Sequence, residues 1–250
     1  MDPLFEFLCR MGDNTLVLGH RVSEWCGHAP VLEEDIALAN TALDMIGQTQ
    51  MWLGLAGEVE AKGRSADDLA MLRDVWDFRN LLLVEQPNGD FGQTILRQCL
   101  FDLWHKDMLT ALTASTNPRI AEIAAKAVKE VTYHAERSAD LVIRLGDGTE
   151  ESRARMQAAL DRLMPNTGEM FQDDDTDRAL AAEGVAPLPS SLQAGYDARL
   201  GALLAEATLT RPESRYAQAG GRTGRRHSEH LGHLLTQMQW LQRAYPWATW

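Results

Sequence analysis

The sequence predicts an all-α fold, a helical bundle with additional peripheral helices. Ala and Leu are abundant, and Gly and Pro gather between the periodic segments instead of within them. Apolar residues recur at the three- and four-residue steps of amphipathic helices, and no segment alternates with the period of a strand. Four long helices with short connections favour a bundle. The length of 250 residues suits one large domain or two small ones, and we predict a single domain over residues 1–250.

The stretch 33–61 is expected to be the central helix. One apolar face comprises Ile36, Ala39, Leu43, Ile46 and Leu53, and a second comprises Leu38, Ala42, Met45 and Trp52. A helix that is apolar on two faces is usually buried on both, so we expect both faces to be covered. Acidic residues in the first turn suit the positive end of the helix dipole. Polar residues along the helix argue against a membrane span.

The other helices are predicted from periodicity and from start and stop signals. A stripe from Leu4 to Trp25 predicts a first helix that ends near 27–30. Asp90 is a plausible N-cap, and Asn117 with Pro118 is a cap followed by proline at the first helical position. The further expected helices span about 67–83, 90–112, 119–145, 149–163, a short piece at 169–171, a short helix that Gly184 closes, 190–209 and 228–243.

Charge and cysteine content limit the possible functions. The formal net charge is −12 and the sequence pI is about 5.0, so we expect no nucleic-acid partner and no anionic membrane partner. The one basic cluster lies at 215–226, where 220–226 could cradle a phosphate, form a mobile basic surface loop or dock an acidic partner. Three widely spaced cysteines and an acidic N-terminus favour a reduced, cytoplasmic location.

Metal-ligand patterns are incomplete. Bundles often bind metals through Glu-x-x-His, since an i, i+3 step places both side chains on one face. The sequence has no such pair, and its nearest match is Asp102 with His105. Two i, i+4 pairs are Glu24 with His28 and Glu130 with His134, and hydrogen-bonded or ion-pair roles compete with ligation at each. A zinc site is a further alternative at His227, His230 and His233 with Glu229.

Several stretches resemble one family. They are LGHRVSEWCGHAP (18–30), LANTALDMIGQ (38–48), NLLLVEQPNGDF (80–91), KAVKEVTYH (126–134) and HSEHLG (227–232). The chain resembles the structural C subunits of bacterial ring-1,2-phenylacetyl-CoA epoxidases over nearly its whole length. The resemblance implies a ferritin-like fold and a homologous catalytic subunit that carries a carboxylate-bridged di-iron centre. That complex uses O₂ and electrons from a reductase to epoxidise the aromatic ring of phenylacetyl-CoA.

The resemblance also implies that this chain lacks the iron chemistry. Where the catalytic relative has metal-binding Glu and His, this sequence has Met45 and Gln48, and Val131 replaces the Glu that precedes His134. Thioether, amide and aliphatic groups do not replace the ligands that iron prefers. We therefore expect a non-catalytic scaffold subunit with no metal or cofactor of its own. The partners would be the di-iron catalytic subunit and other epoxidase components, including a reductase.

Two sets of site residues follow. A hydrogen-bonded network is expected where the iron site would have been, at Asp44, Gln48, Asp102, His105, Glu130 and His134. By the resemblance, contact with phenylacetyl-CoA is expected at Asp74, Val75, Trp76, Asp77, Thr176, Asp177 and Arg178, with solvated surface as the alternative. Trp240, Trp247 and Trp250 are candidates for a contact between subunits, or else core or tail.

Two other functions remain as alternatives. One is a catalytically active di-iron oxygenase with an atypical ligand set, built on Asp102, His105, Glu130 and His134. The other is a free-standing bundle that binds a ligand and has no redox partner. Turnover of phenylacetyl-CoA by the chain alone would favour the first. An elution profile that the catalytic homologue leaves unchanged would favour the second.

Overall fold

The computed structural model describes residues 2–213 and 217–248, and within them it contains helices and turns but no strand. The all-α prediction is confirmed. The chain divides into two compact units, of which unit 1 is Met1–Pro87 with Ala219–Trp250 and unit 2 is Asn88–Gln218. The expectation of one domain stays a prediction. None of the described helices combines the length and apolar character that a membrane span requires.

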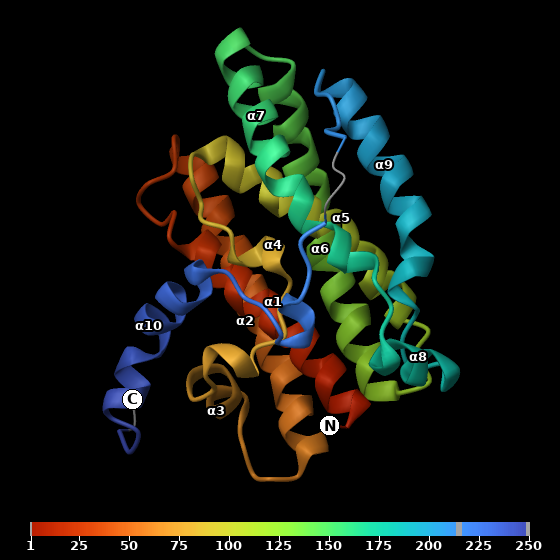
Figure 1. Ribbon diagram of the computed structural model, residues 1–250. Helices are drawn as coiled ribbons and strands as arrows, with labels where there is room; N and C mark the ends of the chain where they lie inside the picture. The colour runs from red at the N-terminus through yellow and green to blue at the C-terminus, as the bar shows by residue number, and fades with distance from the viewer. Residues whose placement is uncertain (1, 214–216, 249–250) are drawn as a thin grey trace. The chain divides into compact units, whose positions relative to one another are not determined.

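Unit 1 is built on two long helices, α1 (Pro3–Ser23) and α2 (Leu32–Glu60), which pack along each other (Figure 1). Asp2 caps α1 by accepting hydrogen bonds from the backbone N–H groups of Leu4 and Phe5, and Pro3 takes the first position. The shorter elements of the unit are α3 (Ala66–Met71), η1 (Val75–Asp77), α4 (Leu82–Glu85), η5 (Gly221–Thr223) and α10 (Glu229–Ala244).

A glycine lets α1 and α2 approach closely. A Cβ atom on Gly12 of α1 would lie 2.5 Å from the Leu53 side chain of α2. Leu53 is buried, as is the second predicted face of α2, which includes Met45 and Trp52. The close packing of these two helices therefore depends on a residue without a side chain on α1.

The prediction that α2 is covered on both apolar faces is wrong. Ile36 is 52 % exposed and Leu43 is 69 % exposed, although both belong to the first predicted apolar face. Leu53, on the same predicted face, is buried. Periodicity identifies apolar positions, but it does not say whether the same chain covers them.

The prediction of one helix over 67–83 is also wrong, because polar contacts with α1 hold this segment in another shape. α3 starts at a capping box between Ser65 and Asp68 and ends at Met71. The buried Arg73 side chain then pairs with Asp13 of α1. Further along, Asn14 of α1 accepts a hydrogen bond from the backbone N–H of Leu81, at 2.8 Å. These contacts with α1 hold the segment between α3 and α4 in a non-helical path.

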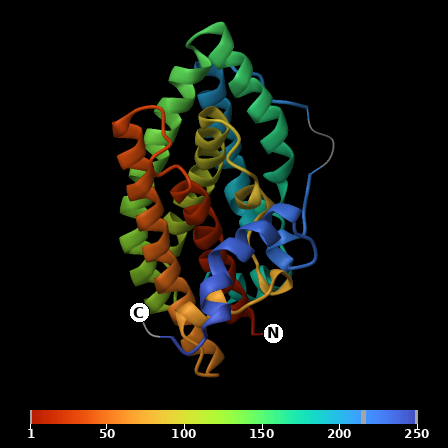
Figure 2. The same ribbon diagram turned by 90° about the vertical axis from the view of Figure 1, so that its left-hand side faces the viewer.

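Unit 2 follows its prediction more closely. Asp90 accepts from the N–H of Gln93 at the start of α5, and Asn117 caps α6 with Pro118 at its first position. Its α-helices are α5 (Phe91–Leu112), α6 (Pro118–Gly146), α7 (Glu150–Leu163), α8 (Asp175–Ala182) and α9 (Gln193–Glu206). Three 3-10 turns, η2 (Met164–Asn166), η3 (Gly168–Phe171) and η4 (Pro189–Leu192), connect them. α6 and α7 form a hairpin, which is at the top of Figure 2.

Candidate functional site

The carboxylate of Glu85 is the polar centre of unit 1. It is fully buried, and its Oε1 accepts from Asn80 Nδ2 at 2.9 Å and contacts His227 Nδ1 at 2.5 Å. Its Oε2 accepts from both the backbone N–H and the hydroxyl of Ser228, each at 2.6 Å. Four groups therefore surround one buried carboxylate, which offsets the cost of burying it.

The same contacts attach the C-terminal segment to α4 and to the segment before it. His227 Nε2 lies 3.2 Å from the carbonyl oxygen of Phe78. Because carboxylate and carbonyl oxygens only accept, both contacts are satisfied together when both ring nitrogens carry a proton. Arg21 of α1 donates to the carbonyl oxygens of Glu85 and His230, at 3.1 Å each. These bonds fix where α10 begins.

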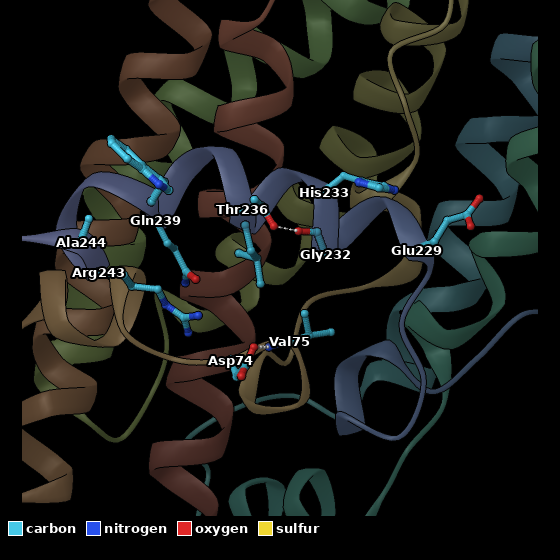
Figure 3. Close-up of a pocket in the computed structure, with 11 residues that line it drawn as sticks. Asp74, Val75, Glu229, Gly232, His233, Thr236, Gln239, Arg243 and Ala244 are labelled. Carbon is cyan, nitrogen blue, oxygen red and sulfur yellow. Dashed lines mark hydrogen bonds between the residues drawn. The ribbon is translucent and has the colours of Figure 1, made fainter.

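A groove of about 710 Å³ lies between η1 and α10, within unit 1. Figure 3 shows Asp74 and Val75 on one side of it and Thr236, Gln239 and Arg243 on the helix opposite. Gln239 donates to the carbonyl oxygens of Ala70 and Arg73, and Arg243 donates to that of Arg73. Two of the polar side chains on the wall thus hold the carbonyl groups near the end of α3.

The first group of expected substrate contacts lies at this groove. Asp74 and Val75 line it. Asp74 accepts from the N–H of Val75, and Asp77 accepts from the N–H of Asp74, so both carboxylates are engaged in the turn. Trp76 is exposed, and its ring centroid lies 6.2 Å from that of His227. The turn thus presents an aromatic surface on a backbone that its own carboxylates fix.

The second group lies on α8 of unit 2. Asp174 and Asp177 form the capping box that starts α8, and Asp177 is buried. Arg178 is exposed and pairs with Asp175 at 2.7 Å. Thr176 lies between them and is half-buried. This geometry explains Asp177 as a helix cap and leaves substrate contact by the group a prediction.

The carboxylate of Asp102 is the polar centre of unit 2. Gln98 donates to its Oδ1 at 2.7 Å, and the hydroxyl of Ser138 on α6 donates to its Oδ2 at 2.9 Å. Burial raises the pKa of the Asp102 carboxyl to about 6, and the charge of His134 and the two hydrogen bonds oppose that rise. Within this unit the structure therefore links two of the predicted residues, Asp102 and His134, electrostatically.

His105 lies one turn after Asp102 and is completely buried. Neither of its ring nitrogens has a hydrogen-bond partner in the described part of the chain. Burial, with a smaller contribution from the charge of His134, lowers the pKa of His105 to about 3. The ring packs against Phe101, with the centroids 4.9 Å apart. His105 is thus a neutral ring in an aromatic setting.

These residues do not fit a carboxylate-bridged di-iron centre. Both oxygens of Asp102 already accept hydrogen bonds, and Met45 and Val131 bring buried apolar side chains to positions where the resemblance implies Glu. Among the described residues, no group of three or more His, Cys, Asp or Glu side chains could hold a metal ion. Iron requires several carboxylate oxygens or imidazole nitrogens together.

The remaining members of the expected network are divided between the units. Asp44 and Gln48 lie on α2 in unit 1, where Gln48 is buried and Asp44 is half-buried. Glu130 is half-buried on α6 in unit 2. A network of all six residues stays a prediction.

The zinc alternative at the C-terminal histidines is not favoured by the structure. Both nitrogens of His227 already face Glu85 and Phe78, and His233 is exposed beside the groove.

The loop at 220–226 packs onto the turn after η1. A Cβ atom on Gly224 of this loop would lie 2.2 Å from Arg79 Nη1. Of the three Trp candidates, Trp240 and Trp247 are exposed, and Trp250 lies outside the described residues.

Sequence reasoning missed Glu85, Ser228, Gln98 and Ser138 as members of the polar centres. Gln98 precedes Asp102 by one helical turn and Ser138 follows His134 by one turn, so helical spacing could have found both. Glu85 is the one charged residue in the run Leu81–Gln86, and such a residue in an apolar run is a signal for a buried carboxylate. Its main partners are far away in sequence, and no local pattern points to them.

Comparison with known proteins gives two full-length matches. A family model described as "Phenylacetic acid catabolic protein" matches residues 1–250. The chain is also 46 % identical over 250 residues to the C subunit of the 1,2-phenylacetyl-CoA epoxidase of Escherichia coli strain K12, with 100 % of both chains covered. These matches, with the all-α architecture, confirm the resemblance and the ferritin-like fold class that the sequence predicted.

Proposed function

Because the chain belongs to the phenylacetic acid catabolic protein family, we propose that it is the non-catalytic structural subunit of a phenylacetyl-CoA 1,2-epoxidase. The observation that carries this proposal is the full-length match to the C subunit of the Escherichia coli enzyme. In this role the chain scaffolds a homologous catalytic subunit, and it works in the cytoplasm as part of phenylacetate catabolism.

The donor chemistry supports the non-catalytic part of the proposal. Met45 and Val131 are buried and apolar, and hydrogen bonds from Gln98 and Ser138 occupy both oxygens of Asp102. A bridged pair of cations requires carboxylates at these places. The di-iron centre therefore belongs to the catalytic subunit, and a reductase supplies that subunit with electrons.

We further propose that the turn at Asp74, Val75, Trp76 and Asp77 contacts the CoA ester. Trp76 offers an exposed indole on which a planar base can stack. The groove beside the turn has a volume of about 710 Å³, which is room for part of the CoA ester. Replacing Trp76 with Ala should raise the KM for phenylacetyl-CoA in the assembled enzyme and leave kcat nearly unchanged.

Reconstitution tests the function. The catalytic homologue and the reductase are purified with and without this chain, and phenylacetyl-CoA-dependent O₂ consumption is measured. We expect epoxidation only in the mixture that includes the chain, and we expect iron in the catalytic subunit alone when each purified chain is analysed. Unimpaired epoxidation without the chain would contradict the scaffold role, and stoichiometric iron in the chain would contradict the non-catalytic one.

A further inference from the structure

The outer face of α2 carries large apolar side chains that the rest of the described chain leaves uncovered. We define the outer stripe of α2 as Ile36, Asn40, Leu43, Gly47, Gln50 and Gly54, which follow one another at four- and three-residue steps. Such steps place all six on one line along the helix. Ile36 and Leu43 are more than half exposed, and Asn40, Gly47 and Gln50 are also exposed.

The stripe has no formal charge. Between Ile36 and Gly57 the only Asp, Glu, Lys or Arg residue is Asp44, which lies off the stripe. A face of α2 that stayed in water would be expected to carry charged side chains. Depletion of charge around exposed aliphatic residues is instead the composition found at the core of protein interfaces.

Two glycines make notches in the stripe. A Cβ atom added at Gly47 or Gly54 would have no atom within 4 Å, so open space lies in front of both. Glycines on an exposed helix lower its stability and give this chain no packing in return. They do allow the backbone of a second helix, or a large side chain from it, to approach α2 closely.

We propose that the outer stripe of α2 binds the matching helix of the homologous catalytic subunit, in an antiparallel pair. This inference rests on the proposed function. In an antiparallel pair related by an approximate two-fold axis near position 45, Leu43 lies opposite position 47 of the partner helix and Ile36 lies opposite position 54. Large side chains of each helix then enter the notches of the other.

Charge identifies the partner as a different chain and not a second copy. The first turn of α2 is acidic, and Glu58 is exposed near its other end. An antiparallel pair of identical helices would place these acidic ends together, in a chain whose net charge is already −12. We therefore expect the partner helix to have basic residues toward its ends and, on the face that meets the stripe, an uncharged middle that alternates large and small residues.

Binding measurements with two variants test the proposal. Leu43→Glu puts a charge on the stripe, and Gly47→Leu fills a notch; neither position contacts other parts of the described chain closely, so both variants should fold. The probe is the purified catalytic homologue from the same source, titrated against the full chain in a calorimeter. We expect each variant to raise the Kd at least about 30-fold, as loss of a central interface residue does.

Matched controls come from unit 2. Tyr133→Glu places the same charge on an exposed residue of α6, and Gly201→Leu adds the same side chain to an exposed glycine of α9 that also has no atom within 4 Å of its Cβ position. Both should leave the Kd within about 2-fold of the wild-type value. Circular dichroism of all four variants should show unchanged helix content.

The possible outcomes are distinguishable. If the wild-type chain binds the homologue and both α2 variants bind equally well, the α2 inference is overturned while the proposed function stands. If the wild-type chain does not bind the homologue at all, the proposed function fails and the inference fails with it. If the chain alone sediments as a dimer and Leu43→Glu makes it a monomer, a second copy occupies the stripe, and the inference is again overturned.

Discussion

α2 and α6 are both 29 residues long, and their outer faces differ in chemistry. α6 has nine Asp, Glu, Lys or Arg residues distributed along its length, whereas α2 has six, of which five lie in its first and last turns and only Asp44 lies between Ile36 and Gly57. In the described chain, the exposed large hydrophobic residues lie in unit 1 except for Tyr133 of α6. A charged outer face suits a helix that stays in water, and an apolar one suits a helix that another chain covers. Helix length and burial of the inner face do not distinguish the two cases.

The polar centres of the two units also differ, in how far along the sequence each carboxylate finds its hydrogen-bond partners. Asp102 in unit 2 takes its hydrogen bonds from Gln98, four residues away, and from Ser138 on the next helix. Glu85 in unit 1 takes most of its contacts from His227 and Ser228, more than 140 residues away in the sequence. The polar centre of unit 2 is therefore formed by neighbouring elements, whereas that of unit 1 forms only with a segment that is distant in the sequence.

The largest effect is expected from removing the carboxylate of unit 1. Glu85→Ala leaves His227, Ser228 and Asn80 without their shared acceptor in a buried site. Breaking such a group should lower the free energy of unfolding by about 3–5 kcal/mol. Urea titration followed by circular dichroism measures it. Glu136→Ala, at an exposed position of α6, is the control and should change the value by less than about 0.5 kcal/mol.

Removing the charge of Asp102, the buried carboxylate of unit 2, should instead raise the free energy of unfolding. The pKa of Asp102 is raised in the folded state to about 6 from 3.8, so the folded chain loses stability as the pH rises from about 4 to about 6. Asp102→Asn removes that loss and should raise the free energy of unfolding at pH 8 by up to about 3 kcal/mol, with little gain at pH 4.

Urea titrations at both pH values measure the effect of Asp102→Asn. The exposed Asp140→Asn should show no such pH dependence. A loss of stability at pH 8 would mean that the carboxylate of Asp102 stabilises its unit as that of Glu85 does.

A smaller effect is expected where the loop at 220–226 meets the turn after η1. Gly224 has φ +65°, and a Cβ atom there would overlap Arg79. Gly224→Ala should therefore lower the free energy of unfolding by about 2 kcal/mol, from backbone strain and steric overlap together. Gly63 has φ +76° with no atom within 4 Å of its Cβ position, so Gly63→Ala isolates the strain, at about 1 kcal/mol. Equal losses in the two variants would mean that the close approach is unimportant.

The smallest effect is a gain on the outer stripe of α2. Gly47→Ala places a better helix former at an open position, so the isolated chain should become more stable by up to about 1 kcal/mol. Gly12→Ala is the contrast, since its Cβ atom would overlap Leu53 and stability should fall. Thermal unfolding of the two variants measures both. A loss at Gly47 would mean that part of the same chain covers the stripe.

Local signals in the sequence predicted most of the fold. The capping residues Asp90 and Asn117 marked the starts of α5 and α6, because a cap is formed within one helical turn. The helix expected over 67–83 failed because the buried pair of Asp13 and Arg73 joins residues 60 positions apart. Periodicity also predicted that α2 is apolar, but it could not show that Leu43 is left uncovered.

The candidate site could be predicted only where spacing along a helix determines it. Asp102 and His105 were identified because they are three residues apart, and His134 because it follows Glu130 by four residues. The group around Glu85 was not identified, since His227 and Ser228 lie more than 140 residues after Glu85 in the sequence. Substrate contact at Asp74 was expected from the resemblance alone. The groove beside it was not predicted, because its walls combine a turn with a helix that begins at Glu229.

The separation between Glu85 and His227 has a consequence for biosynthesis. His227 follows Glu85 by 142 residues, so at a translation rate of about 5–20 residues per second it leaves the ribosome on the order of ten seconds later. During that interval the nascent chain holds an acidic side chain whose imidazole counterpart has not yet been made. Translation that stops before codon 227 would release a polypeptide in which α1, α2 and Glu85 lack the C-terminal segment that completes their unit. Such a product is a natural target for cellular proteases.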